Sequence, residues 1–413
     1  MRQLLFAAGL FAAPLAAQDD PALIARARAI HDRVMTLDTH VDISPANFTA
    51  ERNYTQRLSN QVNLPKMEEG GLDAVFFIVY VGQDTAFTPE AYARAHAAAI
   101  AKFEAIHRLT EELAPTRIGL ALTAADARRI YASGRKVAFI GIENGYPIGT
   151  DLGNVKKFYD LGGRYMSLAH NGHSQLSDSN TGERDGVWLH DGLSPLGRQV
   201  IAEMNRLGIM VDISHPSKQS MMQTLALGTA PIIASHSGVR AICNHSRNLD
   251  DEQLLGLKKN GGVAQLVAFS SYVKCGQESP ERQAALTALR QKYGVTGAGR
   301  GQSIPDSVRA AYQAEMDALG QKFPPPPRAT VKDFANHIDY AVKLIGIDHV
   351  GISSDFDGGG GVEGWGDASE TFNVTLELVR RGYTEAQIAK LWSGNLLRVL
   401  EAVERAAARL KSE

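Results

Sequence analysis

Residues 137–143 read Val-Ala-Phe-Ile-Gly-Ile-Glu, a continuous apolar run that ends in a single carboxylate. An apolar run without alternation indicates a strand that is buried on both faces, as in a parallel sheet. Strand-like runs recur along the chain, and each is followed by a helical pattern. The eight predicted strands are Val34–Asp42, Ala74–Val81, Val137–Glu143, Tyr165–His170, Ile209–His215, Ile232–His236, Val263–Phe269 and Val350–Asp355.

Helical patterns separate these strands, with apolar residues at three- and four-residue spacing over Pro89–Leu113, Pro195–Leu207 and Val331–Ile345. Eight strand–helix units are the number that closes a (β/α)8 barrel. We therefore predict the α/β class, with a TIM-like barrel as a single domain over residues 18–413. Residues 276–328 separate the seventh and eighth strands and contain Gly-rich and Pro-rich stretches, so we expect a surface insertion there.

The composition excludes several classes of protein. The chain of 413 residues carries 43 Lys and Arg against 45 Asp and Glu, a net charge of −2, which argues against a nucleic-acid-binding protein. Beyond the N-terminus no apolar run approaches the roughly 18 residues of a membrane span. Residues 1–17, one arginine and then an apolar run, are typical of a signal peptide rather than of an ordinary N-terminal helix. We therefore expect an exported protein, periplasmic or secreted, without a lipid-anchor tail.

Metal-ligand side chains stand at the carboxyl ends of the predicted strands, the face on which barrel enzymes carry their active sites. His40 and Asp42 close the first strand, and residues two apart in a strand point to the same side, so both can bind one metal ion. Glu143 ends the third strand, where burying a carboxylate requires a cation or hydrogen-bond donors nearby. Its two oxygens can bridge two divalent ions. The alternative is a surface histidine, an N-capping aspartate and a glutamate that emerges into solvent.

Two further histidines, His215 and His236, end the fifth and sixth strands, each directly after a serine. Packing can explain either histidine alone. Together with the three ligands above they form a nitrogen and oxygen set that suits zinc, with manganese or cobalt as substitutes. Two ions about 3.5 Å apart can hold a hydroxide between them and polarise a carbonyl group. The sequence thus predicts a binuclear metal site.

Asp355 ends the eighth strand, and Asp357 follows two residues later on the same predicted face. A carboxylate beside a metal-bound water is a natural proton acceptor, and later the donor to a leaving amine. Spacing alone does not choose between the two residues, and both also fit the start of the Gly-rich turn 358–361.

In this order the motifs resemble the membrane dipeptidases, also called renal dipeptidases, a zinc metallopeptidase family within the amidohydrolase-like barrels. The resemblance covers nearly the whole chain that follows the signal peptide. It rests on Asp38–Asp42, Glu143–Gly145, Ser167–Asn171, Asp212–His215, Ser235–Ser237, Ser246–Asn248, Gly351–Gly358 and Gly394–Val399. It implies that His40, Asp42 and Glu143 are ligands of a first zinc ion, and that Glu143 bridges to a second zinc ion held by His215 and His236.

The resemblance also implies catalytic and substrate-binding residues that the sequence alone does not single out. His170 corresponds to a histidine that contacts the substrate and stabilises the tetrahedral oxyanion. Arg247 corresponds to the residue that binds the C-terminal carboxylate of the substrate, and Tyr272 to a tyrosine of the substrate pocket. Asp355, rather than Asp357, corresponds to the proton-shuttling acid.

The resemblance implies a dipeptidase that acts on dipeptides, including L-Xaa-D-Xaa, through attack of a hydroxide that bridges the two zinc ions. It also implies a disulfide between Cys243 and Cys275, and a homodimer is one possible assembly. The alternative function is a metal-dependent deacylase or a lactam-opening hydrolase on the same site. A third reading is a non-catalytic binding protein that uses the insertion for a partner.

Overall fold

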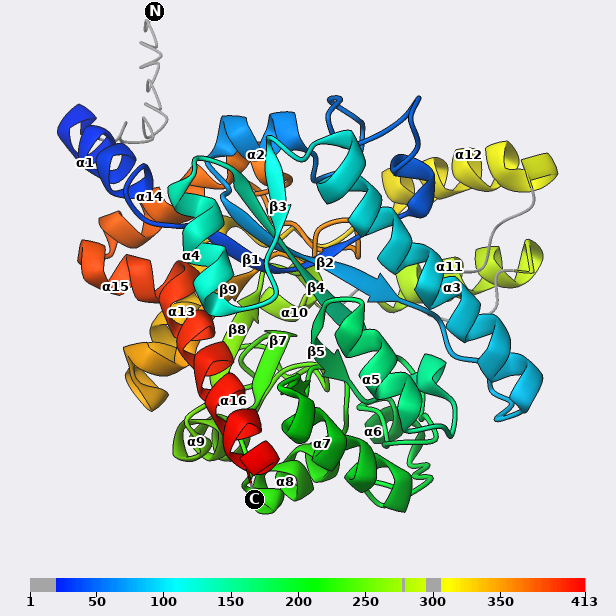
Figure 1. The fold of residues 1–413 in the computed structure, drawn as a ribbon. Coiled ribbons are helices and arrows are strands. Elements are labelled where there is room, and N and C mark those ends of the chain that lie inside the picture. The colour runs from blue at the N-terminus through cyan, green and yellow to red at the C-terminus, as the bar shows by residue number, and fades with distance from the viewer. Residues whose placement is uncertain (1–19, 277–278, 295–305, 413) are drawn as a thin grey trace, which may run out of the picture.

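The computed structural model describes residues 20–276, 279–294 and 306–412, so the predicted signal peptide lies outside the described residues. Its centre is a nearly closed barrel of eight parallel strands surrounded by helices (Figure 1), which confirms the α/β class and the TIM-like architecture. The strands follow one another around the barrel in the order β1 (Leu37–Asp42), β2 (Ala74–Tyr80), β4 (Lys136–Glu143), β5 (Gly163–Ser167), β6 (Met210–Asp212), β7 (Ile233–Ser237), β8 (Val263–Val267) and β9 (Val350–Ser353).

The last barrel strand meets the first only in part. The backbone N–H of Asp42 donates to the carbonyl of Phe356 at 2.9 Å. The N–H of Ser354 donates to the buried carboxylate of Asp38, also at 2.9 Å. These bonds close the gap between β9 and β1 and bring the ends of both strands, which carry candidate ligands, to the same mouth of the barrel.

The strand β3 (Ile118–Leu120) is absent from the sequence prediction. It pairs with the beginning of β4 and lies off the path of the barrel. Three residues form too short a run for apolar periodicity to distinguish a strand from a loop.

Helices cover the outside of the barrel, and two of them, α7 (Pro195–Leu207) and α13 (Val331–Ile345), have the predicted bounds. Ser194 and Thr330 begin these helices, because each side chain accepts a hydrogen bond from a backbone N–H of the first turn. The predicted helix from Pro89 comprises α3 (Pro89–His107) and a π-helical turn. The other helices are α1 (Pro21–His31), α2 (Leu64–Gly70), α4 (Ala124–Ala132), α5 (Gly153–Asp160), α6 (Gly182–Asp185), α8 (Lys218–Leu227), α9 (Asp251–Asn260), α10 (Ser270–Val273), α11 (Pro280–Lys292), α12 (Asp306–Lys322), α14 (Phe372–Arg380), α15 (Glu385–Ala389) and α16 (Asn395–Ser412).

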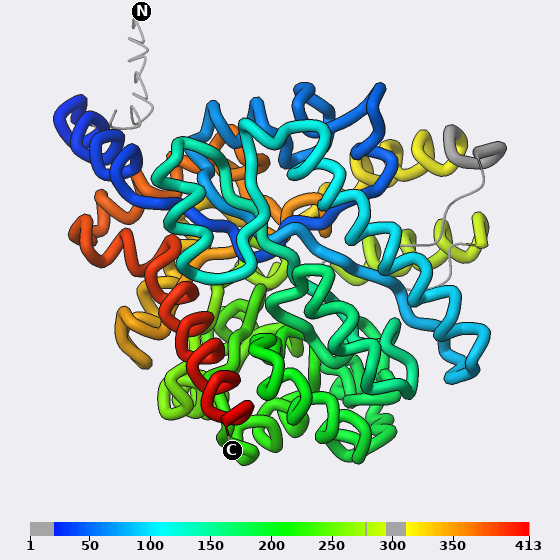
Figure 2. Tube along the Cα trace, viewed as in Figure 1, coloured from blue at the N-terminus to red at the C-terminus, as the bar shows by residue number. Residues whose placement is uncertain are grey.

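The first helix of the described chain packs against a helix from its C-terminal part. Figure 2 shows α1 beside α14, and Nδ1 of His31 lies 2.8 Å from the hydroxyl of Thr375. Helices α11 and α12 lie between β8 and β9 in the chain and extend to one side of the barrel (Figure 1). Within the described ranges no helix is both long and apolar enough to cross a bilayer.

Candidate metal centre

Side chains from the carboxyl ends of three barrel strands converge on Glu143, which ends β4. Its Oε1 lies 2.9 Å from Nε2 of His215 and 3.3 Å from Nε2 of His236. Its Oε2 lies 3.5 Å from Nε2 of His40 on the other side. The Nε2 atoms of His215 and His236 are 3.0 Å apart. Glu143 therefore stands between two groups of ligand atoms, which is the position of a bridging carboxylate.

Asp42 and Asp355 complete the group around His40. Oδ2 of Asp42 lies 3.7 Å from Nε2 of His40. One ligand atom from each of these three residues lies within 4.8 Å of the others. Donors about 2.0–2.2 Å from one ion lie at most about 4.4 Å apart, so only a small movement of these side chains would bring them onto a single ion.

The ring of His40 is oriented by its other nitrogen. Nδ1 lies 2.9 Å from the hydroxyl of Tyr165, and that hydroxyl donates its proton to the carbonyl of Thr39 at 3.0 Å. The hydroxyl oxygen must therefore accept the Nδ1–H of His40. Nε2 is buried and, among the described residues, has no hydrogen-bond partner. An orphaned imidazole nitrogen aimed at two carboxylates fits a metal ion.

The other two imidazoles are oriented in the same way. The hydroxyl of Ser235 donates to Asp212 at 2.6 Å, so its oxygen accepts Nδ1–H of His236 at 2.8 Å. Oδ1 of Asn171 lies 3.1 Å from Nδ1 of His215. Each Nδ1–H thus has an acceptor, and each Nε2 presents a lone pair to the centre, as metal-binding histidines require.

The electrostatics favour the metal-binding form at His215 and His236 but not at His40. At His40 burial is outweighed by the carboxylates of Glu143, Asp42 and Asp355, which raise the pKa to about 9, so this ring must lose a proton to bind a metal ion. Burial lowers the pKa of His215 and of His236 well below the usual value, which keeps both rings neutral. Burial opposes ionisation of Glu143, yet the four histidines around its carboxylate hold its pKa well below the usual range. Neutral imidazoles and an ionised carboxylate are the forms that coordinate a divalent ion.

The two candidate acids after β9 point in different directions. Asp355 and Asp357 have φ angles of 58° and 59°, in the left-handed region that non-glycine residues rarely adopt. Asp355 faces the group of His40 and Asp42. Asp357 instead accepts hydrogen bonds from the backbone N–H of Gln61 at 2.8 Å and from other donors of that loop. Only Asp355 therefore lies at the metal centre.

Gly358 allows Asp355 and Asp42 to approach each other. A Cβ at this position would lie 2.1 Å from Oδ1 of Asp355 and 2.2 Å from Oδ2 of Asp42. We expect Gly358→Ala to push both carboxylates aside and to weaken metal binding and turnover by about 10- to 100-fold, as loss of supporting contacts does elsewhere. Metal titration with a dipeptide assay measures both effects.

A matched control for that substitution is Gly320→Ala, because a Cβ on Gly320 would meet no atom within 4 Å. This variant should keep wild-type metal affinity and activity. Metal affinity and turnover of Gly358→Ala equal to those of Gly320→Ala would contradict the close approach of the two carboxylates.

The remaining predicted site residues line the same mouth. Nε2 of His170 lies 3.7 Å from Oε1 of Glu143, and its ring centroid is 4.2 Å from that of His215. Arg247 is 3% exposed and donates from Nη2 to the carbonyl of His236 at 3.1 Å. Its Nε has no hydrogen-bond partner among the described residues. A buried guanidinium with an unused donor is suited to bind an anion.

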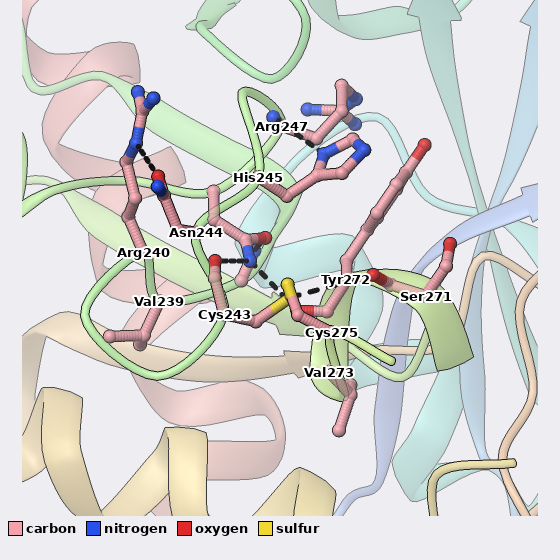
Figure 3. Close-up of a disulfide and its surroundings, with 12 residues drawn as sticks. Val239, Arg240, Cys243, Asn244, His245, Arg247, Ser271, Tyr272, Val273 and Cys275 are labelled. Atoms are coloured by element: carbon pink, nitrogen blue, oxygen red, sulfur yellow. Dashed lines mark hydrogen bonds between the residues drawn. A yellow bond between two sulfur atoms is a disulfide. The ribbon is translucent and has the colours of Figure 1, made fainter. Parts of the chain in front are cut away.

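A disulfide between Cys243 and Cys275 is present, as the resemblance implies (Figure 3). It joins the loop that follows β7 to the segment after α10, which carries Tyr272. The side-chain amide of Asn248 donates to the carbonyl of Cys243 in its own loop at 2.9 Å and, across the same junction, to that of Tyr272 at 2.8 Å. Together these links fix the tyrosine relative to Arg247.

Sequence reasoning overlooked the residues that support the ligands. Tyr165 and Asp212 orient two of the histidines, and the ring of Tyr80 lies 4.5 Å from that of His170. Asp212 and Tyr80 are polar residues at the carboxyl ends of β6 and β2, a position that could have drawn attention to them. Tyr165 begins the predicted strand Tyr165–His170, far from the strand's carboxyl end, where nothing distinguishes it from a core residue.

Comparison with known proteins gives a consistent result over nearly the whole chain. The family model described as "Membrane dipeptidase (Peptidase family M19)" matches residues 24–413. Dipeptidase tcpJ of Claviceps purpurea (strain 20.1) is 32% identical over 360 residues, which cover 86% of this chain and 72% of that relative. Dipeptidase aclJ of Aspergillus oryzae (strain ATCC 42149 / RIB 40) is 31% identical over 371 residues, 88% of this chain and 74% of the relative.

Solved structures share the fold. The probable dipeptidase PvdM from Pseudomonas aeruginosa is 31% identical with a TM-score of 0.80, covering 94% of this chain and 99% of its own. A metallopeptidase from Rhodobacter sphaeroides, liganded with a phosphinate mimic of the dipeptide L-Ala-D-Ala, is 24% identical with a TM-score of 0.66, covering 90% and 99%. The second likeness shows the fold alone.

Proposed function

The chain belongs to the membrane dipeptidase family, peptidase family M19, and we propose that it is a dipeptidase with two zinc ions that accepts L,L and L,D dipeptides. The observation that carries the two-ion proposal is the carboxylate of Glu143, whose two oxygens face His40 on one side and the pair of His215 and His236 on the other. One carboxylate between two ligand groups is the arrangement that holds two ions close together. Zinc suits the mixture of imidazole and carboxylate ligands.

The proposed ligands of one ion are His40, Asp42 and Glu143, and those of the other are Glu143, His215 and His236. When bound, the ions polarise the peptide carbonyl and lower the pKa of a water molecule. His170 donates a hydrogen bond to the carbonyl oxygen as negative charge develops on it. Burial lowers the pKa of His170, so the ring is a neutral N–H donor at pH 7.

The substrate is held at its C-terminal end. Arg247 binds the free carboxylate through its unused Nε–H, and Tyr272 packs beside it, with the guanidinium carbon 5.5 Å from the ring centroid. Such an anchor selects short peptides, because a longer chain would have to place its next residue where the guanidinium stands. The L-Ala-D-Ala mimic bound by the Rhodobacter sphaeroides protein supports acceptance of a D-residue at this end.

Asp355 takes the proton of the attacking water and passes it to the leaving amine. Its side chain lies beside His40 and Asp42 and is 7% exposed, so the proton stays within the site. An amine leaves only after it is protonated, which gives this acid a role in both halves of the reaction.

Metal removal tests the proposed function. Purified protein should contain about two zinc ions per chain and release both amino acids from a panel of L,L and L,D dipeptides. Chelation should abolish release, and added zinc should restore it in proportion to the metal bound. Metal content is measured by mass spectrometry on the sample that is assayed. Undiminished hydrolysis by the stripped protein would overturn the proposal.

A deacylase acting on N-acyl amino acids is the second candidate, because these compounds offer Arg247 the same α-carboxylate. The same protein sample should be assayed with N-acetyl-alanine and L-Ala-L-Ala side by side. A higher kcat/KM for the dipeptide supports the dipeptidase. A higher value for the acetylated amino acid supports the deacylase.

We further propose that the protein is exported through its N-terminal signal peptide. The disulfide between Cys243 and Cys275 supports export, because such bonds persist in oxidising compartments. We also propose that residues 276–328 form a surface insertion. We propose, in addition, that the protein is a homodimer, which size determination in solution would test.

A further inference from the structure

An aromatic wall stands beside Arg247 at the rim of the site. The ring of His245 packs against that of Tyr272, tilted by 37° with centroids 4.6 Å apart, and Tyr272 stacks on Phe269 at 4.2 Å. Figure 3 shows the imidazole of His245 between Arg247 and Tyr272. The disulfide and Asn248 hold both sides of this wall, so its geometry is fixed before a substrate arrives.

The hydrogen bonds of His245 define which of its nitrogens is free. The backbone N–H of Arg247 donates to Nδ1 of His245 at 3.1 Å, so Nδ1 is the acceptor and the neutral ring carries its proton on Nε2. Burial, together with the cations Arg247 and Arg240, lowers the pKa of His245, which keeps the ring neutral at pH 7. Among the described residues no group hydrogen-bonds to Nε2. The rim therefore presents one fixed, unused donor.

The Nε2–H of His245 lies on the side of the site where the C-terminal residue of a substrate would bind. The guanidinium of Arg247 is buried, whereas His245 is half-buried, two residues earlier in the chain. With its carboxylate on Arg247, the C-terminal residue of a substrate would place its side chain near this wall, because Tyr272 stands 5.5 Å from the guanidinium carbon and His245 packs against Tyr272. In the proposed reaction the scissile carbonyl would lie at the metal centre, which would put the amino-terminal residue beyond it and away from the wall.

We propose that Nε2–H of His245 selects dipeptides whose C-terminal side chain carries a carbonyl oxygen, as a carboxamide or a carboxylate does. This inference rests on the proposed function, because Arg247 must hold the substrate carboxylate. A neutral hydrogen bond of this kind changes binding by about 3- to 10-fold. Since the bond exists before and during the reaction, the change is expected in KM rather than in kcat.

Two substitutions distinguish the acceptor role of Nδ1 from the donor role of Nε2 in His245. His245→Asn keeps an oxygen near the place of Nδ1, which can still accept from Arg247, and removes the donor. His245→Gln keeps a donor near the place of Nε2 and removes the acceptor. Each protein is assayed with L-Ala-L-Gln, L-Ala-L-Glu, L-Ala-L-Met and L-Ala-Gly, where methionine has a similar length without a carbonyl oxygen.

The ratio of kcat/KM for the Gln substrate over the Met substrate should fall about 3- to 10-fold in His245→Asn and stay near wild type in His245→Gln. The Glu substrate should follow the Gln substrate, and L-Ala-Gly should be unaffected in His245→Asn. An unchanged Gln/Met ratio in His245→Asn would overturn the inference, as would an equal loss on all four substrates, which would make His245 a positioning residue for Arg247. Failure of the wild type to hydrolyse any of the four would overturn the proposed function itself.

Discussion

Replacing Glu143 by glutamine is expected to reduce dipeptide hydrolysis by far more than 100-fold and to lower the zinc content of the chain. Loss of a residue that merely supports a ligand costs about 10- to 100-fold in metal affinity or activity. Glu143 is itself the shared ligand, with oxygens 2.9 Å from His215 and 3.5 Å from His40. An amide has nearly the same shape but no charge, so in the proposed two-ion site it could not offset the mutual repulsion of the divalent ions.

Three measurements on this variant separate metal loss from misfolding. Zinc per chain and kcat/KM should fall together, while thermal unfolding in the presence of chelator should remain cooperative. Glu143→Asp keeps the charge with a shorter reach, so it should retain more metal than Glu143→Gln. Glu183→Gln is the control, because Glu183 is a carboxylate that pairs with Arg240 away from the metal centre. Wild-type zinc content and turnover in Glu143→Gln would contradict a bridging role.

The barrel could be predicted because buried parallel strands leave a strong signal in the sequence. Runs such as Val137–Glu143 are apolar throughout, and the observed β4 matches this run to within one residue. The short β3, which lies off the barrel path, gives no comparable signal, because three residues are too few to show a periodicity. The barrel could therefore be predicted because its strands are buried on both faces, and not because of strand propensity.

The ends of the strands were harder to predict, for a conformational reason. The run Ile209–His215 predicts a strand through the histidine, whereas β6 ends at Asp212 and His215 has a φ of 83°. The same left-handed turn at Asp355 and Asp357 cancels the rule that residues two apart share a face, so the two carboxylates diverge. Alternation predicts which residues approach the mouth, but it cannot predict where each side chain points after the strand has ended.

Site residues on the loops are even harder to predict from the sequence pattern. Arg247 and His170 follow β7 and β5 at no fixed spacing, and only the family resemblance singled them out. Their place in the structure depends on contacts that are distant in the chain, such as the link between Asn248 and Tyr272. Local patterns do not encode such contacts, whereas motifs shared with a family record them indirectly.

Asp355→Asn is expected to lower kcat by about 100- to 10,000-fold, the range that general acid–base groups supply, with KM and zinc content near wild type. The amide keeps the size of the side chain but can no longer accept the proton of water or give one to the amine. Because proton transfer occurs in the transition state, kcat and kcat/KM should fall equally.

Asp357→Asn is the matched control for this experiment. Its carboxylate lies two residues away with nearly the same φ, yet it accepts from Gln61 and Asn60 rather than facing the metal centre. This variant should keep wild-type kcat, with at most a small loss of stability. Zinc loss from Asp355→Asn would instead make Asp355 a metal ligand, because its oxygen lies within 4.8 Å of ligand atoms of both His40 and Asp42. Measuring zinc and kcat on the same samples therefore decides whether the carboxylate that shares this corner with His40 and Asp42 carries a proton or holds an ion.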